Sequence, residues 1–209
     1  MSEVRSDFGW THRTQPPAGG TPRGVLFLLH GTGGDETSLL ELGAMAAPDH
    51  LLVGVRGRSD EEGVTRYFRR YDALHYDQDH LASEADALAA FIAAAAQRYG
   101  ARALPRRALG YSNGANVALA AALRNPGRFA GLALLRAVQP FEQPPTPDLT
   151  GLSVLLLAGR HDPYSVAGRS LPDYLAGLGA TVDAVVQEAG HGLTGDDIAQ
   201  LTRWFAALG

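Results

Sequence analysis

The chain of 209 residues contains no cysteine and no lysine, so all 18 of its basic residues are arginines. The absence of cysteine excludes disulfides, thiolate nucleophiles and cysteine-ligated zinc. The absence of lysine excludes Schiff-base catalysis and the phosphate-binding lysine of a P-loop. The protein therefore cannot carry out any mechanism that depends on a thiol or an amine side chain.

Long apolar runs and a strong charge of one sign are also missing. The segment Met1–Asp7 has no apolar core of signal-peptide length, and later apolar runs are interrupted by Gly, Arg or Asn well before membrane-spanning length. The formal net charge of −4 argues against a nucleic-acid surface, which needs clustered basic charge. We therefore expect a cytoplasmic protein with no nucleic-acid partner and no membrane insertion.

The composition is that of an ordinary globular protein. Hydrophobic residues make up 45% and charged residues 19%, which is enough apolar material for a substantial core. A length of 209 residues predicts a single domain covering residues 1–209. The oligomeric state stays open, with a homodimer as one alternative.

Short apolar runs alternate with longer helical patterns, which predicts an α/β fold with a mostly parallel sheet covered by helices on both faces. The weaker alternation of Phe8–Thr14 predicts an antiparallel edge strand, and Pro140–Pro147 is interpreted as a surface loop. The expected strands are Val25–His30, Leu51–Val55, Ala108–Tyr111, Gly131–Leu135, Val154–Ala158 and Thr181–Gln187. The expected helices are Leu81–Tyr99, Asn113–Arg124, Gly168–Leu178 and Thr194–Leu208.

A serine motif lies at one of the expected strand-to-helix junctions. The residues Gly110–Gly114 read G-Y-S-N-G, which matches the G-x-S-x-G pattern of a serine on a sharp turn between strand and helix. Side chains at the two glycine positions would collide with the neighbouring strand and helix. The pentapeptide alone leaves open that Ser112 is only a helix N-cap.

A base and an acid follow in the order that such a serine requires. Asp162 comes just after one expected strand and His191 just after another, so both belong at the carboxyl edge of the sheet with Ser112. A serine hydroxyl becomes a good nucleophile when a histidine removes its proton and a carboxylate orients that histidine. The alternatives are an Asp-Pro turn for Asp162 and a surface position for His191, with His161 as a rival base.

Two backbone amides are candidates for an oxyanion hole, which would stabilise the negative charge of an acyl-transfer intermediate. Asn113 begins the helix after the serine, where the helix dipole favours an anion. Thr32 lies in the glycine-rich loop after the first buried strand. A dinucleotide-binding interpretation of that loop would need a glycine where Glu36 stands, and an acidic residue would repel a pyrophosphate.

From about Gly24 to Leu208 the chain resembles the small α/β-hydrolases of the carboxylesterase/phospholipase family, which includes acyl-protein thioesterases, and is most similar to a bacterial branch of small carboxylesterases. The resemblance implies Ser112 as nucleophile, Asp162 as acid, His191 as base, and Thr32 and Asn113 as oxyanion donors. Val55 and Tyr164–Ser165 differ from the residues usual in that branch. The resemblance therefore implies the chemistry but not the shape of the acyl pocket. Six segments carry the resemblance: His30–Glu36, Arg56–Gly57, Tyr67–Arg70, Leu109–Asn116, Ala158–Pro163 and Gly190–Thr194.

Arginines and aromatic residues interleave between positions 56 and 71. We hypothesise that Arg69 or Arg70 binds an anionic part of the substrate, with Tyr164 as a further substrate contact. The alternative for the arginines is internal pairing with nearby carboxylates. A second cluster, formed by His75, Asp77, Asp79 and His80, has no standard metal-site spacing and is interpreted as a solvated turn before a helix.

Together these observations predict a serine hydrolase that cleaves carboxylic esters of short to medium acyl chains and needs no cofactor or metal. Only Arg136–Leu152 separates two expected strands, which is too short for a lid domain, so the site should be open. Two alternatives remain: a thioesterase or lysophospholipase for long acyl chains, and a non-catalytic ligand-binding protein on the same fold. A dienelactone hydrolase with a cysteine nucleophile is excluded.

Overall fold

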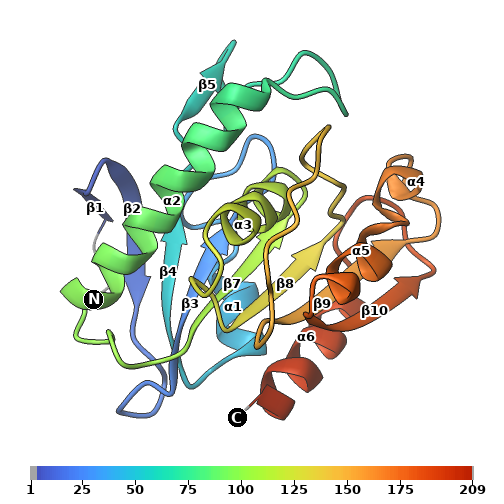
Figure 1. Ribbon diagram of the computed structural model, residues 1–209. Helices are drawn as coiled ribbons and strands as arrows, with labels where there is room; N and C mark the ends of the chain where they lie inside the picture. The colour runs from blue at the N-terminus through green and yellow to red at the C-terminus, as the bar shows by residue number, and fades with distance from the viewer. Residues whose placement is uncertain (1–3, 209) are drawn as a thin grey trace.

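An eight-stranded sheet forms the centre of the molecule (Figure 1). The structure is a computed structural model and describes residues 4–208. Residues 1–3 and 209 of the expected domain lie outside the described part. The strand order is β1-β2-β4-β3-β7-β8-β9-β10, and all neighbours from β4 to β10 are parallel. The strands are β1 Val4–Asp7, β2 Trp10–Gln15, β3 Gly24–Leu29, β4 His50–Val55, β7 Arg106–Tyr111, β8 Gly131–Leu135, β9 Ser153–Gly159 and β10 Thr181–Gln187.

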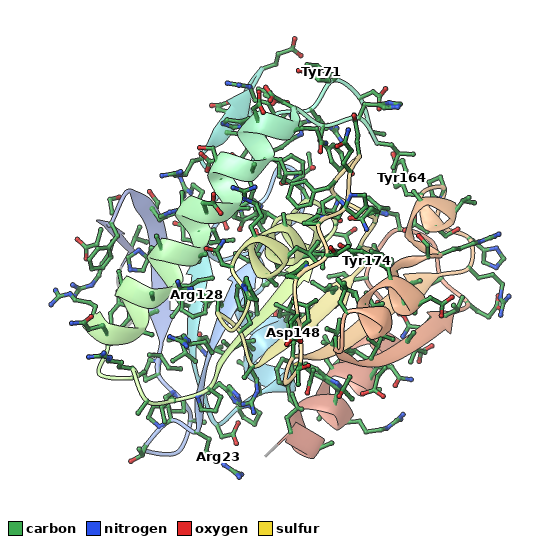
Figure 2. The ribbon with its side chains drawn as sticks, in the orientation of Figure 1. Arg23, Tyr71, Arg128, Asp148, Tyr164 and Tyr174 are labelled. Carbon is green, nitrogen blue, oxygen red and sulfur yellow. The ribbon has the colours of Figure 1, made fainter. Side chains whose placement is uncertain are left out.

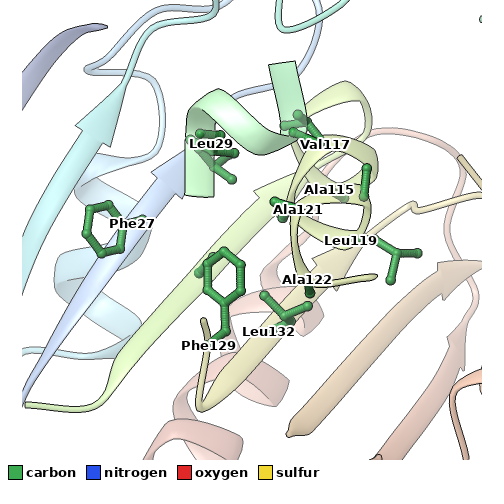
Figure 3. Close-up of a cluster of buried hydrophobic side chains, with 14 of the residues drawn as sticks. Phe27, Leu29, Ala115, Val117, Leu119, Ala121, Ala122, Phe129 and Leu132 are labelled. Carbon is green, nitrogen blue, oxygen red and sulfur yellow. The ribbon is translucent and has the colours of Figure 1, made fainter. Parts of the chain in front are cut away.

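Helices cover both faces of the sheet, as the sequence predicts. Helices α2 (Gln78–Arg98), α3 (Asn113–Arg124), α4 (Ser165–Gly168) and α5 (Leu171–Gly177) lie on the near face in Figure 1, and α1 (Leu40–Ala46) and α6 (Gly195–Leu208) lie behind it. Each face has its own buried apolar cluster. On the α3 side, Leu29 of β3 lies toward Ala121 of the helix (Figure 3), and Phe27 packs against Phe91 of α2. Five of the twelve α3 residues are alanine, which lets this helix pack closely on the sheet.

The N-terminal strand differs from the prediction, because Phe8–Thr14 contains a turn. Phe8 and Gly9 both have positive φ (57° and 76°), the pattern of a two-residue hairpin loop, and they join β1 to β2. Strand β2 then pairs antiparallel with β4, so β1 and not β2 is the edge of the sheet. The antiparallel addition is confirmed and its bounds are corrected.

The predicted helix Gly168–Leu178 is observed as α5, and the short helix α4 ends where the predicted range begins. Pro172 stands in the first turn of α5, where its missing N–H costs nothing, but it could not continue a helix arriving from α4. Gly168, at the end of α4, lies so close to the chain that an added Cβ would be 2.5 Å from the Ala137 carbonyl oxygen. The predicted helix is therefore confirmed, with its start corrected from Gly168 to Leu171.

Further elements were not predicted, and one helix begins earlier than expected. Helix α1 and the small antiparallel pair β5 (Ser59–Glu61) and β6 (Val64–Arg66) have no clear periodicity. Helix α2 begins at Gln78 because the Asp77 side chain caps it, accepting a hydrogen bond from the His80 amide at 3.0 Å. The polar turn expected before this helix is therefore partly its first turn.

The segment between β8 and β9 carries no lid. Residues 136–152 contain neither helix nor strand, so the Pro-rich stretch is a loop, as predicted. No helix in the described range 4–208 is both long and apolar enough to cross a membrane. The carboxyl edge of the sheet is thus left without a covering subdomain.

Candidate active site

The carboxyl ends of neighbouring strands bring the predicted serine, acid and histidine together. Ser112 follows β7 directly, Asp162 lies three residues after β9, and His191 lies four residues after β10. The parallel register keeps β9 and β10 level, with Gln187 opposite Gly159. The His191 Nε2 atom lies 2.9 Å from Ser112 Oγ, and His191 Nδ1 lies 2.9 Å from Asp162 Oδ2.

The turn at Ser112 is strained, and both of its glycines are sterically required. Ser112 has φ 52° and ψ −113°, a backbone conformation that L-residues rarely adopt. A Cβ on Gly110 would lie 2.6 Å from Ala115 Cα, and one on Gly114 would lie 2.0 Å from the Leu29 carbonyl oxygen. The Ser112 side chain makes no capping hydrogen bond to α3, which argues against the N-cap interpretation.

Asp162 is buried and both of its carboxylate oxygens are occupied. One oxygen, Oδ1, accepts the Tyr164 amide at 2.9 Å, and the other contacts His191. The turn alternative is therefore also correct, because the Asp-Pro turn positions the carboxylate under the imidazole. The rival base His161 lies elsewhere, 3.0 Å from Glu188 on the surface.

Buried Arg136 holds the loop that carries His191. Its Nε donates to the Gly190 carbonyl at 3.0 Å and its Nη2 to the Gly192 carbonyl at 3.1 Å, on either side of His191. Its guanidinium also pairs with both oxygens of Asp197 at 2.9 and 2.8 Å, and both side chains have zero exposure. Sequence reasoning missed this residue, although its place directly after β8 was a usable signal.

A small pocket of about 30 Å³ lies above Ser112, and we call it the serine pocket. Both predicted oxyanion residues line it. In the described chain, neither the Thr32 amide nor the Asn113 amide donates a hydrogen bond to another protein group. Both amides are thus available to a ligand. The lining residues are Thr32, Arg70, Ala73, Leu74, Tyr76, Ser112, Asn113, Arg136, Val138, Tyr164 and His191.

A buried network fixes the loop that carries Thr32. His30 Nδ1 donates to the Gly31 carbonyl at 2.6 Å, and His30 Nε2 accepts the Gly57 amide at 3.0 Å. Burial lowers the pKa of His30, which favours the neutral ring that this arrangement needs. Tyr67 links the two sides, since its hydroxyl accepts the His30 amide at 3.1 Å and its amide donates to Asn113 Oδ1 at 2.8 Å.

The three predicted substrate residues have different positions. Arg69 lies outside the serine pocket and pairs with Asp77 (Nη2–Oδ2 2.8 Å), so for this residue internal pairing is the observed arrangement. Arg70 lines the pocket beside Tyr76, whose pKa burial raises to about 12 against the opposing effect of Arg70. Tyr164, labelled near α4 in Figure 2, also lines it, with its ring 5.2 Å from that of His191.

Tyr164 also borders a second, larger pocket, which we call the α4 pocket. This pocket has a volume of about 290 Å³ and lies among β9, β10, α4 and α5. Arg136, Val138 and Tyr164 line both pockets, so these side chains separate them. Much of the α4 pocket is apolar, including Leu156, Leu171 and the exposed Val186.

The cluster near residues 75–80 serves α2 and its loop. His75 Nδ1 lies 2.7 Å from Asp72 Oδ2, and Asp77 caps the helix and pairs with Arg69. No group of three or more histidines or carboxylates within residues 4–208 is arranged to hold a metal ion.

Glu36, at the position that a dinucleotide loop reserves for glycine, is buried and binds Arg56 through both carboxylate oxygens.

Comparison with known proteins identifies the family. The crystal structure of a carboxylesterase from Mesorhizobium loti superposes with a TM-score of 0.92 and 37% sequence identity, covering 98% of both chains. The chain belongs to the carboxylesterase family of α/β-hydrolases. Another family structure, the Bacillus cereus carboxylesterase, gives a TM-score of 0.91 at 30% identity over 98% of this chain and 97% of that one.

A curated relative agrees with this family assignment. The chain is 37% identical over 188 residues to "Putative hydrolase MhqD" of Bacillus subtilis (strain 168), which covers 89% of this chain and 94% of that protein. No family model matches the chain. The resemblance seen in the sequence and the α/β-hydrolase fold are thus confirmed.

Proposed function

We propose that the protein is a serine hydrolase that cleaves carboxylic esters through an acyl-enzyme intermediate. The observation that carries the proposal is the hydrogen-bonded series Ser112–His191–Asp162, with 2.9 Å at each link, at the open edge of the sheet. Membership of the carboxylesterase family supports ester hydrolysis as the reaction. From the sequence we add that this single-domain enzyme works in the cytoplasm without a cofactor.

The reaction proceeds in two balanced steps. His191 Nε2 takes the proton of Ser112 while Oγ attacks the ester carbonyl, and the alcohol leaves with that proton. His191 then deprotonates a water molecule, which attacks the acyl-serine and releases the acid and the serine. Asp162 holds the imidazole and stabilises its charged form, and the amides of Thr32 and Asn113 stabilise the oxyanion in both steps.

A fluorophosphonate probe tests whether Ser112 is an activated nucleophile. Its hydroxyl is expected to displace fluoride and give one label per chain, measured by intact mass. Ser112→Ala should take up no label. Ser153→Ala is the matched control and should label fully, because Ser153 lies at the opposite, amino end of β9. A wild-type protein that stays unlabelled would favour the non-catalytic binding protein instead.

The size of the serine pocket predicts a preference for short acyl chains. A volume of about 30 Å³ has little room for a chain, while Tyr164 stands between it and the 290 Å³ α4 pocket. With p-nitrophenyl esters we expect kcat/KM to be highest from acetate to butyrate and to fall by about tenfold or more at decanoate. Tyr164→Ala should join the pockets and bring decanoate close to butyrate.

Tyr71→Ala is the control for this series, because Tyr71 is 79% exposed on the neighbouring loop. Its chain-length profile should match that of the wild type. An unchanged profile in Tyr164→Ala would remove Tyr164 as the barrier. A wild-type optimum at decanoate would instead favour the thioesterase or lysophospholipase alternative.

A further inference from the structure

Two arginines line the serine pocket, and their charges are balanced differently. The guanidinium of Arg136 is fully buried and neutralised by Asp197. The guanidinium of Arg70 makes no hydrogen bond or ion pair with any side chain or carbonyl in residues 4–208. The pocket that holds the Ser112 hydroxyl therefore has one positive charge that the protein leaves unbalanced.

The neighbouring arginines show that this is unusual for the segment. Each of the other four arginines between positions 56 and 70 has an acidic partner within hydrogen-bond distance. These pairs are Arg56 with Glu36, Arg58 with Glu84, Arg66 with Glu61 and Arg69 with Asp77. Internal pairing thus accounts for every arginine of this segment except the one in the pocket.

The backbone around Arg70 is held in place while its side chain stays available. Its amide donates to Glu61 Oε1 at 3.2 Å, and the residue forms a bridge with Tyr76 across the base of the loop. The other oxygen of Glu61 accepts from Arg66 at 3.0 Å, so this carboxylate is already engaged. The fixed backbone keeps Arg70 at the lining of the serine pocket, and its unpaired guanidinium gives up no internal ion pair when it binds an anion.

We propose that Arg70 binds a carboxylate of the substrate, so that the enzyme prefers esters that carry a negative charge close to the scissile bond. This inference rests on the proposed function, because it places the charge beside an ester bound at Ser112. A guanidinium presents parallel N–H donors that match the two oxygens of a carboxylate. Half-esters of dicarboxylic acids and acyl esters of hydroxy acids are the substrate classes that this arrangement fits.

The test uses pairs of esters that differ only by a methyl group or a carboxylate. Ethyl butyrate and ethyl hydrogen succinate place the charge on the acyl side; ethyl acetate and acetoxyacetate place it on the alcohol side. Hydrolysis is followed by pH-stat titration. Arg70→Gln should lower kcat/KM by about 10- to 100-fold for an anionic ester, mainly through KM, and change its neutral twin less than twofold.

Arg69→Gln is the matched control, because this adjacent arginine lies outside the pocket on Asp77 and should leave both pairs within twofold of wild type. Arg70→Lys should recover part of the loss. An equal effect of Arg70→Gln on charged and neutral esters, or a wild-type preference for the neutral twins, would overturn the inference while Ser112-dependent hydrolysis stands. Hydrolysis of no ester at all would overturn the proposed function and this inference together.

Discussion

Replacing Ser112 with alanine is expected to lower kcat for ester hydrolysis on the order of 10⁶-fold, with KM changed only a few-fold. The size of this effect follows serine-protease triads, in which loss of the nucleophile costs about as much as loss of all three residues. The hydroxyl is 2.9 Å from the only imidazole in the serine pocket, and no other hydroxyl of the described chain hydrogen-bonds to that ring. The measurement is hydrolysis of p-nitrophenyl butyrate at saturating substrate.

Ser153→Ala serves again as the control and should keep wild-type kcat. The thermal midpoint of Ser112→Ala should stay close to that of wild type, since the hydroxyl makes no capping bond to α3. Retention of more than a tenth of wild-type turnover by Ser112→Ala would exclude this residue as the nucleophile.

Replacing Arg136 with alanine is expected to destabilise the protein by about 3–5 kcal/mol, the usual cost of leaving one partner of a buried ion pair uncompensated. Asp197 would then be fully buried without a cation, and the carbonyls of Gly190 and Gly192 would lose their donors. For a chain of this length the thermal midpoint should fall by about 10 °C, measured by calorimetry. Arg124→Ala, which breaks the exposed pair with Asp86, should cost under about 1 kcal/mol.

A double variant separates the stabilising role of Arg136 from its role as a positioning residue. In Arg136→Met with Asp197→Leu, no buried charge is left unpaired, so much of the stability should return. The kcat should stay at least about tenfold below wild type, because the loop around His191 still lacks its two donors. Full recovery of kcat in the double variant would show that Arg136 acts only on stability.

Much of the sheet was predictable, because its buried strands are continuous apolar runs. Gly131–Leu135, which is such a run, was predicted with its observed bounds, and so was the mostly exposed edge strand Thr181–Gln187. Helix α3 was also predicted with its observed bounds, since an alanine-rich stretch ends at Asn125-Pro126. Helix α1, the pair β5–β6 and the short helix α4 were missed. Their form depends on contacts with distant segments, such as the approach of Gly168 to Ala137.

The core of the candidate site was predictable for a topological reason. Ser112, Asp162 and His191 each follow a parallel strand, and parallel strands deliver such residues to one edge. The residues that line the rest of the serine pocket were harder to predict from the sequence. The ion pair of Arg136 with Asp197 joins residues 61 positions apart in the chain. The unpaired side chain of Arg70 can be recognised only once the acidic partners of the neighbouring arginines are known. The place of Arg136 after β8 marks it as a residue of this edge, but spacing along the chain does not reveal the partner of Arg136 or the lack of one for Arg70.

The backbone conformation of Ser112 implies a trade-off between the stability of the protein and its catalytic activity. An L-residue held at φ 52° costs folding free energy that a glycine at the same place would largely recover. Substitution of Ser112 by glycine would therefore relieve the backbone strain of this turn but remove the hydroxyl. Selection for turnover, and not for stability, keeps serine at this position.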